Sequence, residues 1–165
     1  MLNNILNNVE NMMEQETQVT ANDINEMGFV FIKSTDIISS CGYLIVCMTI
    51  AQFEEENIEA PVVIIDYNFE DLSKNAQAFM IYHELGHYKL QRDKIVSMTG
   101  VYRDINDEFE ADEYAMKQLG HENAVAAMEE MLAMMDELSF GMNEIGMEEV
   151  RVRIENLNKK ALVKA

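Results

Sequence analysis

The feature that most limits what this chain can fold into is a helical segment with two histidines on one face. From Ser73, a good N-cap residue, to about Leu90, apolar residues recur with the 3.6-residue period of an amphipathic helix. Within this segment, residues 83–87 read H-E-L-G-H. Positions i and i+4 share one face of a helix, so the imidazoles of His83 and His87 can bind one metal ion.

Glu84 directly follows the first histidine and points elsewhere around the same turn. It can therefore reach a water molecule on the metal without being a ligand. The H-E-x-x-H pattern is typical of zinc hydrolases, in which this glutamate is the general base. A bound zinc ion lowers the pKa of its water from about 15.7 towards 7 and so supplies a hydroxide nucleophile. We expect one Zn²⁺ per chain, with Glu84 as a catalytic residue.

A catalytic zinc site usually has three protein ligands and one open position. Glu108 and Asp112 lie four residues apart in a second predicted helix, Ile105–Leu119, which ends at Gly120. One carboxylate can bind the metal while the other accepts a hydrogen bond from a ligating imidazole. His121, the third histidine, stands at the start of the next helix, where we expect an exposed residue of the cap region.

H-E-L-G-H followed by E-x-x-A-D resembles the gluzincin metallopeptidases. The resemblance implies the metal ligands His83, His87 and Glu108, the general base Glu84, and Asp112 as a supporting aspartate that contacts His83. It also implies that Ala111 is the small residue that lets the two helices approach each other. Gly86 fits the same need, because glycine costs a helix about 1 kcal/mol relative to alanine.

Within the gluzincins the chain is most similar to the ImmA/IrrE-like family. The chain is short, and a strand-like run, Val62–Asp66, precedes the helix that carries the histidines; the resemblance covers about Val62 to Ala115. It implies a zinc-dependent endopeptidase that cleaves a specific intracellular protein. Since that branch is associated with cleavage of DNA-binding repressors, the expected substrate is a transcriptional regulator.

Three β-branched or aromatic runs predict strands at Phe29–Lys33, Gly42–Ile50 and Pro61–Asp66. Pro61 fits a strand start or an edge strand better than a central position. At a sheet edge, the third strand could pair with an extended peptide substrate. Further helices are expected over Leu2–Glu16, Glu122–Leu138 and Met147–Leu162. A short turn that ends at Met27 is expected after the first of them.

These elements predict the α+β class: a minimal zincin-like domain with a small mixed sheet of about three strands packed on the active-site helix and a mostly helical C-terminal half. We expect one metallopeptidase-like domain over residues 1–165. Residues 1–66 would form the N-terminal helix and sheet, 67–120 the metal-site helices, and 121–165 the C-terminal helices.

The net charge of −18, from 30 acidic and 12 basic side chains, argues against direct nucleic-acid binding, because phosphate contacts need Lys and Arg. The acidity fits a solubilising surface, attraction to a basic partner such as a DNA-binding regulator, or mimicry of nucleic acid. The competing function is therefore a non-enzymatic acidic decoy or anti-regulator on a metal-binding gluzincin scaffold. The absence of a long apolar run or a signal-like start leads us to expect a cytoplasmic protein without membrane association.

Three assignments remain open at this level. The group that stabilises the oxyanion could be one of four tyrosines, Tyr67, Tyr88, Tyr102 or Tyr114, and we favour Tyr102 as a catalytic residue because it lies between the metal-binding segments. Cys41 and Cys47 are interpreted as buried free thiols of an intracellular protein rather than as metal ligands. Four methionines of the Glu122–Leu138 helix either fill the core or form a partner groove or a dimer face: Met128, Met131, Met134 and Met135.

Overall fold

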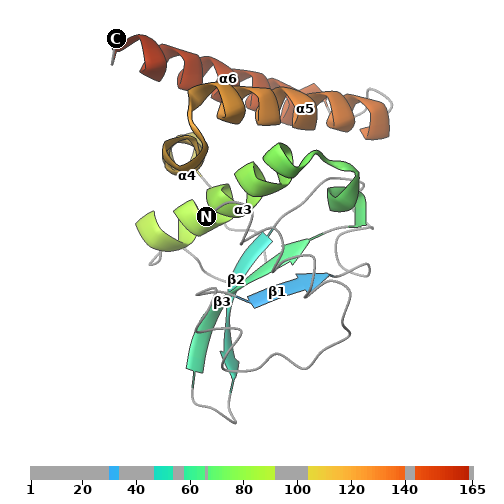
Figure 1. The fold of residues 1–165 in the computed structure, drawn as a ribbon, viewed down its shortest axis with the longest axis vertical. Coiled ribbons are helices and arrows are strands. Elements are labelled where there is room, and N and C mark those ends of the chain that lie inside the picture. The colour runs from blue at the N-terminus through green and yellow to red at the C-terminus, as the bar shows by residue number, and fades with distance from the viewer. Residues whose placement is uncertain are drawn as a thin grey trace.

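The structure is a computed structural model, which describes residues 30–33, 47–53, 58–65, 67–91, 104–139 and 144–163. The helix expected over Leu2–Glu16, the following turn to Met27, and Cys41 lie outside the described residues. Figure 1 shows three layers: a small sheet, the helix α3 next to it, and the helices α4, α5 and α6 beyond α3.

The sheet contains β1 (Val30–Lys33), β2 (Cys47–Phe53) and β3 (Ile58–Ile65) in the order β1-β3-β2. The central strand β3 runs parallel to β1 and antiparallel to β2. β2 begins later and ends later than the predicted run, and β3 begins three residues before Pro61.

The expectation that Pro61 lies at a strand start or on an edge strand was wrong, because Pro61 lies inside the central strand. The pairing with β1 begins one residue later, at Val62, so Pro61 is paired only with Ile50 of β2. At Pro61 the strand therefore pairs on one side only, so the missing backbone N–H of proline breaks no hydrogen bond to β1. Since β3 is flanked by β1 and β2, it is not the free edge to which we expected a peptide substrate to add.

The predicted α+β class was wrong, because the described part of the chain is predominantly helical. From Tyr67 to Val163 the described residues are helical except for short connections, and this region carries the histidines and most of the described core. Among the described residues, the strands have 4, 7 and 8 residues, whereas the four α-helices have between 15 and 20. Long amphipathic helices bury their apolar faces against one another, so helix packing and not a sheet framework organises this fold.

After the 3-10 turn η2 (Tyr67–Asp71), the helix boundaries follow the sequence pattern closely. α3 spans Lys74–Leu90 and α4 spans Ile105–Leu119, as predicted. The hydroxyl of Ser73 accepts a hydrogen bond from the backbone N–H of Ala76, which confirms Ser73 as the N-cap. α4 ends at Gly120, whose φ of 88° lies in the left-handed region that glycine tolerates.

The helices α5 (His121–Ser139) and α6 (Glu144–Val163) complete the fold beside each other (Figure 1). Met128 is completely buried, and the other three methionines of the predicted set are half-buried against the same core. Their interpretation as core residues is therefore confirmed. The core also includes small residues that allow close helix packing: Ala76, Ala115, Ala124 and Ala127.

Candidate metal centre

Helix α3 holds His83 and His87 side by side. They are one turn apart on the buried side of the helix, 7% and 2% exposed. Their Nε2 atoms are 3.0 Å apart, and the two rings meet edge to face. Glu84, on the same turn, is 4% exposed. The i, i+4 spacing has therefore brought both imidazoles to one point, as the sequence predicts.

Helix α4 brings Glu108 to the same point. Its two carboxylate oxygens lie 3.2 Å from Nε2 of His83 and 3.4 Å from Nε2 of His87. The three side chains offer ligand atoms that all lie within 4.8 Å of one another, and all three residues are buried. This group of three can hold a metal ion.

The spacing of these atoms fits a tetrahedral zinc site. With zinc–ligand bonds of 2.0–2.1 Å, two ligand atoms of a tetrahedral site are about 3.3 Å apart. Here the two Nε2 atoms are 3.0 Å apart, and they lie 3.2 and 3.4 Å from the two different oxygens of Glu108, so the separations are close to this value. Two imidazole nitrogens and a carboxylate are also a ligand set that zinc accepts, and they leave a fourth position open. The residues present therefore fit a catalytic zinc ion.

His83 is oriented by Asp112 and Arg153. The Nδ1–H of His83 donates to Oδ1 of Asp112 at 2.8 Å, which leaves Nε2 facing Glu108. Asp112 is completely buried and accepts two hydrogen bonds from Arg153 of α6, at 2.6 and 2.8 Å. The same guanidinium lies 3.2 Å from Glu108. One cation thus contacts both carboxylates of the site.

His87 is oriented by a separate residue, Gln91, the C-cap of α3. The Nδ1–H of His87 donates to Oε1 of Gln91 at 2.7 Å. The amide of Gln91 in turn donates to the backbone carbonyl of Asp107 at 2.8 Å, which fixes its orientation. Both histidines therefore use Nδ1 for support and present Nε2 to the metal position, as metal-binding histidines commonly do.

Sequence reasoning missed Arg153 and Gln91. Gln91 continues the i, i+4 series of His83 and His87, but the predicted helix ended at Leu90. Arg153 lies between Val150 and Leu157 on the buried face of α6. A cation on the apolar face of a helix was the signal that could have found it, because such a residue is rarely buried without a charged partner.

The charges around His83 determine its protonation. Burial lowers the pKa of His83 and so does Arg153, but hydrogen bonds to Asp112 and Glu108 outweigh both and raise its pKa to about 9. Burial raises the pKa of Glu108, whereas its hydrogen bonds to His83 and His87 and the charge of Arg153 lower it overall. A pKa of about 9 keeps His83 protonated at neutral pH, so a metal ion that bound to Nε2 would have to displace a proton.

The close approach of α3 and α4, expected at Gly86 and Ala111, is confirmed. A Cβ atom added to Gly86 would lie 3.0 Å from Cα of Ala111 and 3.1 Å from Cβ of Tyr114. The first of these contacts is to backbone, which cannot rotate away. Gly86 thus sets the distance between the two helices that carry the candidate ligands.

Gly86→Ala should destabilise the protein, although alanine is the better helix former. We expect a loss of about 1–2 kcal/mol, because the overpacking cost exceeds the gain in helix propensity. Urea unfolding measures this change. Ala126→Gly at an exposed position of α5 is the control, and it should lose only about 1 kcal/mol through helix propensity. A Gly86→Ala protein more stable than the parent would contradict the close-contact explanation.

The remaining predicted site residues have different positions. Tyr102 lies outside the described residues, so its catalytic role stays a prediction. The Tyr114 hydroxyl accepts a hydrogen bond from Lys89 at 2.8 Å, on the exposed side of the helix pair. His121 is half-buried and pairs with Asn158 of α6 at 3.1 Å. His121 is not part of the metal-binding group described above.

Comparison with known proteins decides the family. The model of the Peptidase U49 family matches residues 9–143, well over half of the chain. The chain belongs to the Peptidase U49 family. This U49 protein is therefore a peptidase, a hydrolase of peptide bonds. No curated protein and no solved structure matches it. The family match ends before α6, so Arg153 of this U49 peptidase lies beyond the matched residues.

None of the described helices of this U49 peptidase is long and apolar enough to cross a membrane.

Proposed function

We propose that this chain is a zinc-dependent endopeptidase of the gluzincin type that hydrolyses a peptide bond in a specific intracellular protein. The observation that carries the proposal is the arrangement of His83, His87 and Glu108. Their nitrogen and oxygen atoms lie 3.0 to 3.4 Å apart, close to the separations of a tetrahedral zinc site, and both histidines are held by their Nδ1 atoms. Family membership supports the peptidase activity.

The roles of the side chains follow from their positions. His83, His87 and Glu108 would hold the zinc ion, which when bound supplies a Lewis acid and an activated water. Glu84, beside His83 on α3, would accept the proton of that water and later deliver it to the leaving amine. Asp112 and Gln91 would keep the two imidazoles in the tautomer that leaves Nε2 available to the metal.

The substrate is proposed to be a protein with a basic surface, such as a DNA-binding transcriptional regulator. The support is electrostatic: a chain with a net charge of −18 attracts positively charged partners and repels nucleic acid. Such attraction mainly accelerates encounter and is weakened by salt.

The test is metal analysis combined with mass spectrometry of newly formed protein N-termini. The purified protein should contain about one zinc per chain. Added to a lysate of the organism that encodes it, the zinc-loaded protein should generate new N-termini in few proteins. A chelator should abolish these products, and added zinc should restore them. Persistence of the cleavage after complete removal of zinc would refute zinc dependence.

A further inference from the structure

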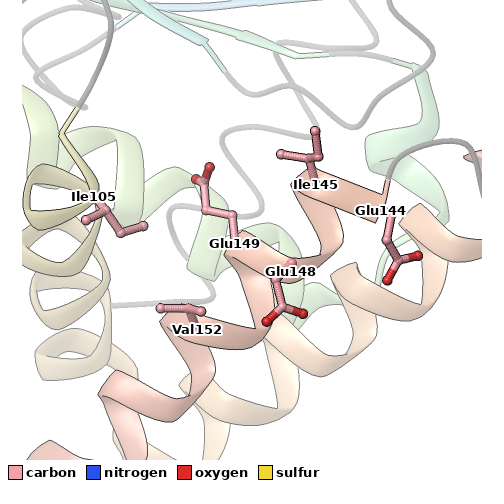
Figure 2. A pocket seen from close by; sticks show the side chains of 6 residues that line it. All are labelled: Ile105, Glu144, Ile145, Glu148, Glu149 and Val152. Atoms are coloured by element: carbon pink, nitrogen blue, oxygen red, sulfur yellow. The ribbon is translucent and has the colours of Figure 1, made fainter.

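An open pocket of about 450 Å³ lies between the start of α4 and the first turns of α6. Figure 2 shows Ile105 of α4 on one side of it and Val152, Glu149 and Ile145 of α6 on the other. Ile145 is 88% exposed and Val152 is 40% exposed. Of the three large apolar residues exposed in the described part of the chain, these two share one pocket, and the third, Leu90, lies on α3. Apolar side chains gathered at a hollow gain free energy when a partner covers them.

Carboxylates accompany this apolar surface. Glu144, Glu148 and Glu149 line the pocket together with the three apolar residues. Arg151 pairs with Glu144 and Glu148 at 3.0 and 3.1 Å. This one positive charge is fewer than the three negative charges of the glutamates, so the pocket keeps a net negative charge. The pocket therefore favours an occupant that combines apolar side chains with positive charge.

The pocket adjoins the metal centre through the two helices that form it. Ile105 lies one helical turn before the ligand Glu108 on α4. Val152 directly precedes Arg153, which contacts Glu108 and Asp112. A chain bound in the pocket would thus lie against the same two helices that place the carboxylates of the site.

We propose that this pocket is a docking site for the protein substrate, where it takes an apolar segment flanked by lysine or arginine. The inference rests on the proposed function and deepens it by naming the chemistry of the recognised segment. Apolar contacts at Ile105, Ile145 and Val152 supply the affinity, and the three glutamates select against acidic sequences.

The test uses the zinc-loaded Glu84→Gln protein, so that probes are not cut, with isotope-labelled isoleucine, leucine and valine methyl groups. Three capped hexapeptides serve as probes: Gly-Lys-Leu-Leu-Lys-Gly, its acidic counterpart with glutamate for lysine, and its polar counterpart with serine for leucine. NMR titration should show that only the first shifts the methyl signals of Ile105, Ile145 and Val152. Equal shifts from the acidic or the polar peptide, or no shift with any, would overturn the proposal.

Matched variants test the two components separately. Combined Ile145→Ser and Val152→Ser should weaken binding of the lysine-leucine peptide by roughly tenfold through lost apolar contact. Glu148→Gln should weaken it by roughly threefold, and only at low salt. Leu90→Ser and Glu155→Gln, at exposed positions outside the pocket, should leave the affinity unchanged. Loss of affinity in the controls equal to that in the pocket variants would contradict a docking site at this place.

Analytical sedimentation of the peptide-free protein tests whether a second copy of this chain occupies the pocket instead of a substrate. Concentration-dependent association that is lost with Ile145→Ser and Val152→Ser would overturn substrate docking in favour of a self-association face. The result also separates the two proposals. If new N-termini form in the lysate but no peptide binds the pocket, the docking site is refuted and the peptidase function stands. If the peptide binds and no protein is cleaved, the peptidase proposal fails, and the pocket stays a binding site for an apolar, basic segment that is no longer a substrate.

Discussion

Glu84→Gln is expected to lower the rate of peptide-bond cleavage by roughly 10²- to 10⁴-fold, the contribution of a general base, while one zinc ion per chain is retained. Glutamine has nearly the shape of glutamate but cannot accept the proton. The expected ligands are His83, His87 and Glu108, so the metal position keeps all its donors in this variant. Metal content, zinc affinity and the rate of product formation are the three measurements.

A matched control is Glu129→Gln, which makes the same change at an exposed position on α5. It should leave both cleavage and zinc content unchanged. Glu84→Gln also distinguishes a peptidase from an acidic decoy, since a decoy inactivates its partner by binding alone. A Glu84→Gln protein that still inactivates the partner without cutting it would favour the decoy.

Arg153→Met is expected to lower the free energy of unfolding of the zinc-free protein by about 3–5 kcal/mol, the usual cost of breaking a buried ion pair on one side. Arg153 is 8% exposed, and its guanidinium is bonded to the fully buried Asp112 and lies 3.2 Å from Glu108. Without it, two carboxylates face each other around His83 with less positive charge to stabilise them. Urea unfolding in the presence of a chelator measures the loss.

Saturating zinc should reduce this loss, because the metal brings positive charge to Glu108 in place of the guanidinium. By linkage, the folded Arg153→Met protein should bind zinc more tightly than the parent, which competition with a coloured chelator can measure. A residue that acted only by packing would destabilise the zinc-free and zinc-loaded forms equally. Arg153→Lys keeps the charge but not the two-pronged geometry, so it should restore part of the stability.

Arg151→Met is the control for Arg153→Met. Arg151 lies two residues away on α6, and its partners Glu144 and Glu148 are exposed, so its removal should cost no more than about 1 kcal/mol. Equal losses for the two variants would contradict the assignment of Arg153 to the support of the site.

Local sequence signals predicted the helices well and the fold class poorly. The N-cap at Ser73 and the stop at Gly120 depend on hydrogen bonds and backbone conformation within a few residues, so they could be read directly. Whether three short strands or four long helices organise the fold depends on packing between segments that are distant in the sequence. That is why an α+β domain was expected and a predominantly helical fold was found.

The sequence by itself determined which candidate residues share a face within each helix, namely His83 with His87 and Glu108 with Asp112. A helical period of 3.6 residues brings each pair to one face wherever the helix lies. Only the tertiary structure decided that the two faces meet and which other side chains surround them. Arg153 reaches Asp112 across 41 positions of the chain, and Gln91 reaches the carbonyl of Asp107 from the end of another helix. No local periodicity encodes such contacts, since they exist only when α3, α4 and α6 are packed together.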